Sequence, residues 1–144
     1  MAITTFRDLR VYERAVALRQ RVFELSQAWP KAERYALTDQ VRLTDQVRRA
    51  SRSVGANVAE AWAKRRYERH FISKLTDAYG EAEEVSTWLD VARECGYIGE
   101  EAHSQLRRLC SEISGGLVRM MQEPEKWCGP AGLVREEPSP YEPD

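Results

Sequence analysis

The stretch from Gln46 to Trp62 limits most strongly what this chain can fold into. Its small and apolar residues recur every three or four positions, the spacing that places side chains on one face of an α-helix. These residues are Val47, Ala50, Val54, Val58 and Ala61. We therefore interpret this stretch as the central helix of an all-helical bundle.

Three further helices are predicted around the central one. A first helix is expected over about residues 6–28, where apolar residues form a broad stripe, and Trp29-Pro30 ends it because proline cannot continue a helix. The central helix is expected to end near residue 63. A third helix is predicted over about 67–94, with Gly96 as its stop signal, and a fourth continues to about 122. These patterns predict an all-α fold, a four-helix bundle that occupies residues 1–123.

Two glycines lie inside the predicted fourth helix, at positions 115 and 116. Glycine weakens a helix by roughly 1 kcal/mol relative to alanine. The pair therefore indicates a kink, a close approach of another helix or a tolerated defect.

A perfect tandem repeat precedes the central helix. The hexapeptide LTDQVR occupies residues 37–42 and again residues 43–48. Six residues turn an α-helix by about 600°, so the two copies would face directions about 240° apart and cannot share one core stripe. Thr38 and Thr44 are each followed by aspartate, a combination that suits a helix N-cap. The repeat predicts either one lengthened helix start or two alternative local registers.

The C-terminal segment differs in composition from the rest of the chain. Residues 124–144 contain five of the six prolines, more acidic than basic residues and little periodicity. We expect a flexible, extended, acidic tail, with Trp127 fixing its start to the bundle.

The composition is that of a globular protein without a membrane span. The chain has 144 residues and a net charge of -1, with no run of about 18 apolar residues and no apolar N-terminal signal. We expect one domain located in the cytoplasm. The three cysteines show no C-x-x-C spacing, and we expect reduced thiols, with Cys95 and Cys110 serving as packing groups.

Charge is unevenly distributed along the chain. Residues 46–70 hold seven basic against two acidic residues, whereas residues 77–101 hold eight acidic residues against one arginine. These segments can neutralise one another within the bundle or between subunits. Alternatively, the basic segment forms a band that binds nucleic-acid phosphates. The residues of this candidate band are Arg48, Arg49, Arg52, Lys64, Arg65, Arg66 and Arg69.

Other polar positions give weaker indications. Asn57 and Glu60 lie three residues apart on the central helix, which predicts a structural polar pair or a ligand contact. A di-iron site in a bundle needs two Glu-x-x-His motifs, and only Glu100 and His103 have that spacing. We expect no metal site, no cofactor and no catalytic residues.

The ordered motifs resemble those of a known family. One run of residues resembles the signature of the four-helix-bundle proteins encoded in intervening sequences of bacterial 23S rRNA genes. This run is Leu43-x-x-Gln46-x-Arg48-Arg49-Ala50-x-x-Ser53-Val54-x-x-Asn57-Val58-Ala59-Glu60. The similarity extends to Phe6-x-x-Leu9-x-Val11-Tyr12 upstream and to Ala78-x-Gly80-x-x-x-Glu84-Val85 and Gly96-Tyr97-Ile98 downstream.

The resemblance implies an antiparallel, up-down-up-down bundle that assembles as a ring-shaped homopentamer and has no enzyme activity. More distantly, the chain resembles accessory variability proteins of diversity-generating retroelements, which bind nucleic acid and a reverse transcriptase. The chain is therefore expected to be an oligomeric, non-enzymatic binding or scaffold protein, for which an RNA or ribonucleoprotein partner is one hypothesis. A scaffold that binds only proteins is the alternative, and a metal-binding helical-bundle enzyme is a remote one.

Overall fold

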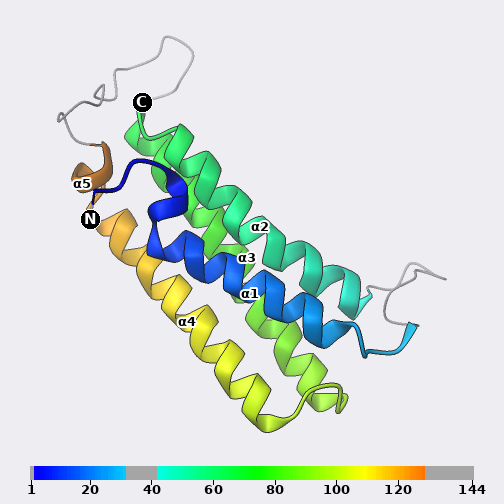
Figure 1. Ribbon diagram of the computed structural model, residues 1–144. Coiled ribbons are helices and arrows are strands. Elements are labelled where there is room, and N and C mark those ends of the chain that lie inside the picture. The colour runs from blue at the N-terminus through cyan, green and yellow to red at the C-terminus, as the bar shows by residue number, and fades with distance from the viewer. Residues whose placement is uncertain (1, 32–41, 129–144) are drawn as a thin grey trace.

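The computed structural model describes residues 2–31 and 42–128, and these residues form helices without any strand. The four long helices are α1 (Arg10–Ser26), α2 (Leu43–Ala63), α3 (Glu68–Glu94) and α4 (Glu100–Gln122), shown in Figure 1. Two short helices flank them, η1 (Phe6–Asp8) before α1 and α5 (Glu125–Cys128) after α4. The first copy of the LTDQVR repeat, up to residue 41, and residues 129–144 of the expected tail lie outside the described residues.

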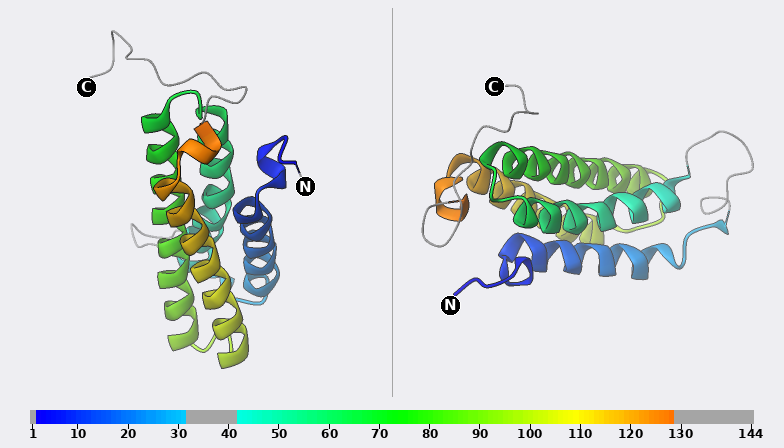
Figure 2. Two further views of the ribbon diagram at one scale, coloured as in Figure 1. Left: turned by 90° about the vertical axis from the view of Figure 1, so that its left-hand side faces the viewer. Right: turned by 90° about the horizontal axis from the view of Figure 1, so that it is seen from above.

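The long helices form an antiparallel, up-down-up-down four-helix bundle, as predicted. Each helix packs against its neighbours in sequence, and α1 also packs against α4, which closes the bundle. The contact between α2 and α3 is the most extensive, whereas the contact between α1 and α4 is the smallest of the four. Accordingly, α1 lies at the side of the bundle in Figure 2. No helix in the described part of the chain is long and apolar enough to cross a membrane.

The core confirms the central position of α2. All five of its predicted core positions are completely buried, and the buried face also includes Ser51 and Gly55. The largest completely buried side chains on the other helices are Leu18, Phe71, Leu75, Leu89, Ile113 and Leu117. Because α2 presents mainly small side chains, its neighbours supply most of the core volume.

The predicted first helix is interrupted near its start. Leu9 has an extended backbone (φ -72°, ψ 134°) and separates η1 from α1. A capping box holds η1, in which the backbone N–H of Thr5 donates to the Asp8 carboxylate (3.0 Å) and the N–H of Arg7 donates to the Thr5 hydroxyl (3.1 Å). Backbone N–H donors from Thr4 and Thr5 lower the pKa of Asp8. The interruption lets Leu9 turn into the core, where it is 2% exposed.

The expected N-cap role of Thr44 is wrong. Helix α2 begins at Leu43, so Thr44 is its second residue, and the preceding Arg42 supplies no side-chain cap. Leu43 and Thr44 are both buried, and the Thr44 hydroxyl has no hydrogen-bond partner within the described residues. Both side chains therefore lie buried in the first turn of α2. Thr38, the other candidate cap, lies outside the described residues.

The glycines of α3 and α4 have different roles in the structure. Gly96 ends α3 with φ +77°, and the N–H of Tyr97 donates to the carbonyl of Ala92 (2.9 Å), the arrangement of a glycine C-cap. Helix α4 runs without interruption through its glycine pair. A Cβ atom on Gly116 would lie 2.5 Å from Cγ1 of Val11, so this glycine permits the close approach of α1.

The start of the C-terminal segment packs on the bundle through Trp127, as predicted. Helix α5 places Trp127 against Trp62, with ring centroids 6.4 Å apart, and Cys128 is buried. Cys110 is also buried, and burial raises the pKa of its thiol to about 12, so it is a packing group. The same expectation for Cys95 is wrong, because this residue is exposed at the end of α3.

Candidate nucleic-acid interface

The seven basic candidates lie in different surroundings rather than on one continuous band. Arg48, Arg49 and Arg52 are on the first half of α2, whereas Lys64 to Arg66 form the corner between α2 and α3 and Arg69 is in the first turn of α3. Twelve residues separate Arg52 from Lys64, which corresponds to about 18 Å along a helix. The contacts of each group therefore decide what it can bind.

Arg49 is occupied within the bundle. Its guanidinium forms an ion pair with Glu81 on α3 (3.3 Å) and a second ion pair with Glu84. The hydrogen bond to Glu84 raises the pKa of Arg49. Partial burial opposes ionisation of Glu84, but the hydrogen bonds from Arg49 and Glu81 and the positive charge of Arg49 together outweigh it and lower the pKa of this carboxyl. Burial and the neighbouring Glu84 carboxyl raise the pKa of Glu81. Here the acidic and basic segments neutralise each other between α2 and α3.

The polar pair of the central helix makes two separate contacts. The side-chain amide of Asn57 donates to the carbonyl of Ser53 within α2 (3.0 Å). Glu60 instead forms an ion pair with Lys74 on α3 (2.9 Å), which lowers the pKa of Glu60 and raises that of Lys74. Glu60 thus cross-links two helices, but its side chain is 55% exposed, and Asn57 takes no part in this link.

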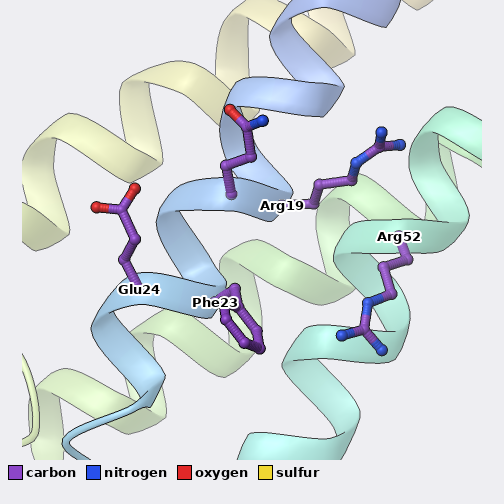
Figure 3. A pocket seen from close by; sticks show the side chains of 5 residues that line it. Arg19, Phe23, Glu24 and Arg52 are labelled. Atoms are coloured by element: carbon purple, nitrogen blue, oxygen red, sulfur yellow. The ribbon is translucent and has the colours of Figure 1, made fainter.

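An open hollow of about 580 Å³ lies between α1 and α2. Its lining residues are Arg19, Gln20, Phe23, Glu24 and Arg52. Figure 3 shows the ring of Phe23 and the side chains of Arg19 and Arg52 directed toward the gap between the helices, while Glu24 points away on the other side of α1.

Arg48 supports this hollow from within the bundle. Its Nε donates to the hydroxyl of Ser26 (2.8 Å), and that hydroxyl donates to the carbonyl of Phe23 (3.2 Å). The Arg48 guanidinium lies 4.7 Å from the centroid of the Phe23 ring, a distance typical of a cation–π contact. Arg48 therefore connects α2 to the C-terminal turn of α1.

The corner between α2 and α3 combines basic and aromatic side chains. The guanidinium of Arg65 lies 3.9 Å from the centroid of the Trp62 ring and donates to the Trp62 carbonyl (2.8 Å). Arg66 lies over the ring of Tyr67 at 5.6 Å. Within the described residues, no carboxylate comes within 4.0 Å of Lys64, Arg65 or Arg66. The three basic side chains of the corner, like Arg52, therefore form no ion pair within the described residues.

The Glu-x-x-His residues do not converge on a common point. His103 lies 2.7 Å from Asp90, whereas Glu100 is 80% exposed and lies 3.7 Å from Arg93. In the described part of the chain, no group of three or more His, Cys, Asp and Glu side chains is arranged to hold a metal ion.

Arg19 and Phe23 were missed by the sequence prediction as candidate binding residues. Phe23 is one of the apolar residues of the broad stripe predicted over residues 6–28, yet its side chain is 42% exposed. The available signal was that the two residues are four apart and lie on one face of α1. What the sequence did not show was that the basic face of α2 lies opposite them.

Comparisons with known proteins agree with this architecture. The family model of the 23S rRNA-intervening sequence protein matches residues 7–119. Among solved structures, the chain is similar to a protein of unknown function from the S23 ribosomal protein family of Bacteroides thetaiotaomicron, with a TM-score of 0.67 and 24% sequence identity. The match covers 78% of this chain and 95% of that one, and it shows the fold. No curated protein matches the chain.

Proposed function

Because this chain belongs to the family of 23S rRNA-intervening sequence proteins, we propose that it is a non-enzymatic, oligomeric protein that binds RNA or a ribonucleoprotein. The observation that carries the proposal is the α2–α3 corner, where Lys64, Arg65 and Arg66 have no carboxylate within 4.0 Å among the described residues. The corner is the proposed contact with the RNA backbone.

The chemistry of the corner suits phosphate groups. An arginine or lysine that is not paired with a carboxylate can bind a phosphate oxygen without first breaking an internal ion pair. Trp62 and Tyr67 hold the guanidinium groups of Arg65 and Arg66 over their rings, which limits the conformations of these long side chains. A net charge of -1 does not oppose such binding, because the field near the corner is set by local charges.

Charge reversal at the corner tests RNA binding. The double variant Lys64→Glu/Arg66→Glu is expected to bind RNA at least about tenfold more weakly at low salt, with a shallower dependence of log affinity on log salt. Arg107→Glu/Arg108→Glu is the matched control, because it makes the same change in net charge at exposed positions of α4. Fluorescence anisotropy with labelled RNA across a salt series measures both quantities. Equal weakening in both variants, or no binding by the unaltered protein at low salt, would contradict the proposal.

Self-association would raise the overall affinity for RNA even if each α2–α3 corner binds phosphate weakly. A ring of subunits, a pentamer by resemblance to the family, would present several corners to one RNA, and linked weak contacts raise the overall affinity. The expected mass in solution is therefore a multiple of 16.6 kDa at micromolar concentration. Analytical ultracentrifugation measures it, and a strict monomer across the micromolar range would remove the oligomer from the proposal.

A scaffold that binds proteins without nucleic acid is the second candidate. The exposed ring of Phe23, 42% accessible beside the hollow between α1 and α2, favours it because aromatic side chains are enriched in protein–protein interfaces. This candidate predicts a partner, such as a reverse transcriptase, that co-purifies from the host after nuclease treatment. The RNA proposal predicts that nuclease releases the partner.

A further inference from the structure

We propose that the hollow between α1 and α2 seats one unpaired RNA base on the ring of Phe23, with the flanking phosphates bound by Arg19 and Arg52 (Figure 3). This inference rests on the proposed RNA binding and adds to it a site of different chemistry. The corner binds only the backbone, whereas this hollow selects single-stranded RNA.

The ring of Phe23 has the properties of a stacking platform. Large apolar side chains in this bundle are mostly buried, yet Phe23 remains 42% exposed and lines the hollow. Bases stack on aromatic rings with little regard to base identity, because every base has a π-face. In a duplex these faces are covered by neighbouring base pairs, so the site fits an unpaired base.

The platform is held in place before a ligand arrives. Arg48 lies 4.7 Å from the ring centroid, and its Nε donates to the buried hydroxyl of Ser26. The same hydroxyl donates to the backbone carbonyl of Phe23, so the Arg48 guanidinium that contacts the ring is itself anchored to α1. A fixed ring loses less conformational freedom when a base stacks on it.

Charges around the hollow complement a nucleotide. Arg19 and Arg52 approach the gap from opposite helices, and neither has a carboxylate within 4.0 Å among the described residues. The carboxylate that also lines the hollow belongs to Glu24, which points away and pairs with Arg21 (3.6 Å). A second copy of this same face would bring like charges together, so self-docking of the hollow is disfavoured.

The decisive experiment measures the affinity of the full-length protein for single-stranded and for duplex RNA of equal length. Phe23→Leu keeps an apolar side chain but removes the π-face, and it is expected to weaken binding of the single strand about tenfold while leaving the duplex nearly unchanged. Phe23→Tyr is the matched control and is expected to retain affinity. Arg19→Ala/Arg52→Ala is expected to reduce the slope of log affinity against log salt by about 1.4, since each phosphate contact on a single strand contributes about 0.7.

Photocrosslinking gives a second readout that does not depend on affinity. Ultraviolet irradiation of the complex, followed by mass spectrometry, is expected to locate a nucleotide on Phe23. If Phe23→Leu binds the single strand as tightly as the unaltered protein while the corner variant Lys64→Glu/Arg66→Glu is impaired, the stacking site is wrong and RNA binding stands. If Phe23→Leu changes the oligomer mass instead, the hollow is a subunit interface and the inference is overturned. If neither the unaltered protein nor any variant binds RNA, both the proposed RNA-binding function and the stacking site are wrong.

Discussion

Replacing Phe71 with alanine is expected to lower the free energy of unfolding by about 3–5 kcal/mol. Phe71 is completely buried in the first turns of α3, and it is the largest of the completely buried side chains. Truncation removes apolar area from the core and leaves a cavity that the surrounding helices can fill only in part. A domain of this size is typically stable by about 5–15 kcal/mol, so the loss would be a large fraction of the total. Urea denaturation followed by circular dichroism measures it.

Phe23→Ala is the matched control for this prediction. It removes the same atoms from a side chain that is 42% exposed and whose ring contacts the Arg48 guanidinium. The expected cost is about 1 kcal/mol or less. Similar losses for the two variants would mean that burial does not distinguish the two phenylalanines as the structure describes. The same control shows whether changes at Phe23 alter RNA binding without unfolding the protein.

Hydrophobic periodicity was sufficient to predict the four long helices, whereas their antiparallel, up-down-up-down arrangement was implied by the family resemblance. The five small and apolar positions of α2 are all completely buried, and α3 and α4 end where the glycine and the loss of periodicity placed their ends. This works because one buried face per helix produces a repeat of 3.6 residues that single substitutions do not hide. The number and order of long helices in the described residues followed from this repeat.

Helix starts were harder to predict than helix interiors. The Thr5-x-x-Asp8 capping box was present in the sequence, but the apolar stripe ran across it and the break at Leu9 went unrecognised. At α2, the Thr-Asp pair pointed to an N-cap, whereas core packing draws Thr44 into the helix. At Thr5 the capping box forms and the helix breaks after it, whereas at Thr44 tertiary burial overrides the local capping preference. Local sequence alone does not reveal which outcome prevails.

The candidate site was predictable in composition but not in grouping. The sequence showed an excess of basic residues over 46–70, yet it could not show that Arg49 faces Glu81 and Glu84, because those acids are more than thirty residues away. It also could not place Arg19 opposite Arg52, since that depends on how α1 packs on α2. Pairing between helices is a property of the fold. It divides the predicted band into Arg49, which is paired with two acids of α3, Arg52 beside the hollow, and the exposed corner between α2 and α3.

The glycine pair in α4 allows the sharpest stability comparison between adjacent residues. Gly116→Ala is expected to destabilise the protein by about 1–2 kcal/mol, because the new methyl group would lie 2.5 Å from Cγ1 of Val11 and force α1 away from α4. Gly115→Ala meets only the flexible end of Arg119, at 3.5 Å, and is expected to stabilise the helix by up to about 1 kcal/mol. The two variants should therefore differ by about 2–3 kcal/mol in urea denaturation.

A double-mutant cycle identifies the cause of that difference. If the clash with Val11 is responsible, Gly116→Ala should cost less when Val11 is already alanine, because the Cγ1 atom that the new methyl group meets is then absent. The coupling energy is expected to be about 1 kcal/mol or more. An additive cycle, or equal effects of alanine at both glycines, would mean that α1 and α4 do not meet at Gly116. Because the α1–α4 contact is the smallest of the four contacts between the long helices, loss of this one close approach should also loosen α1 first, which faster amide exchange in α1 than in α3 would reveal.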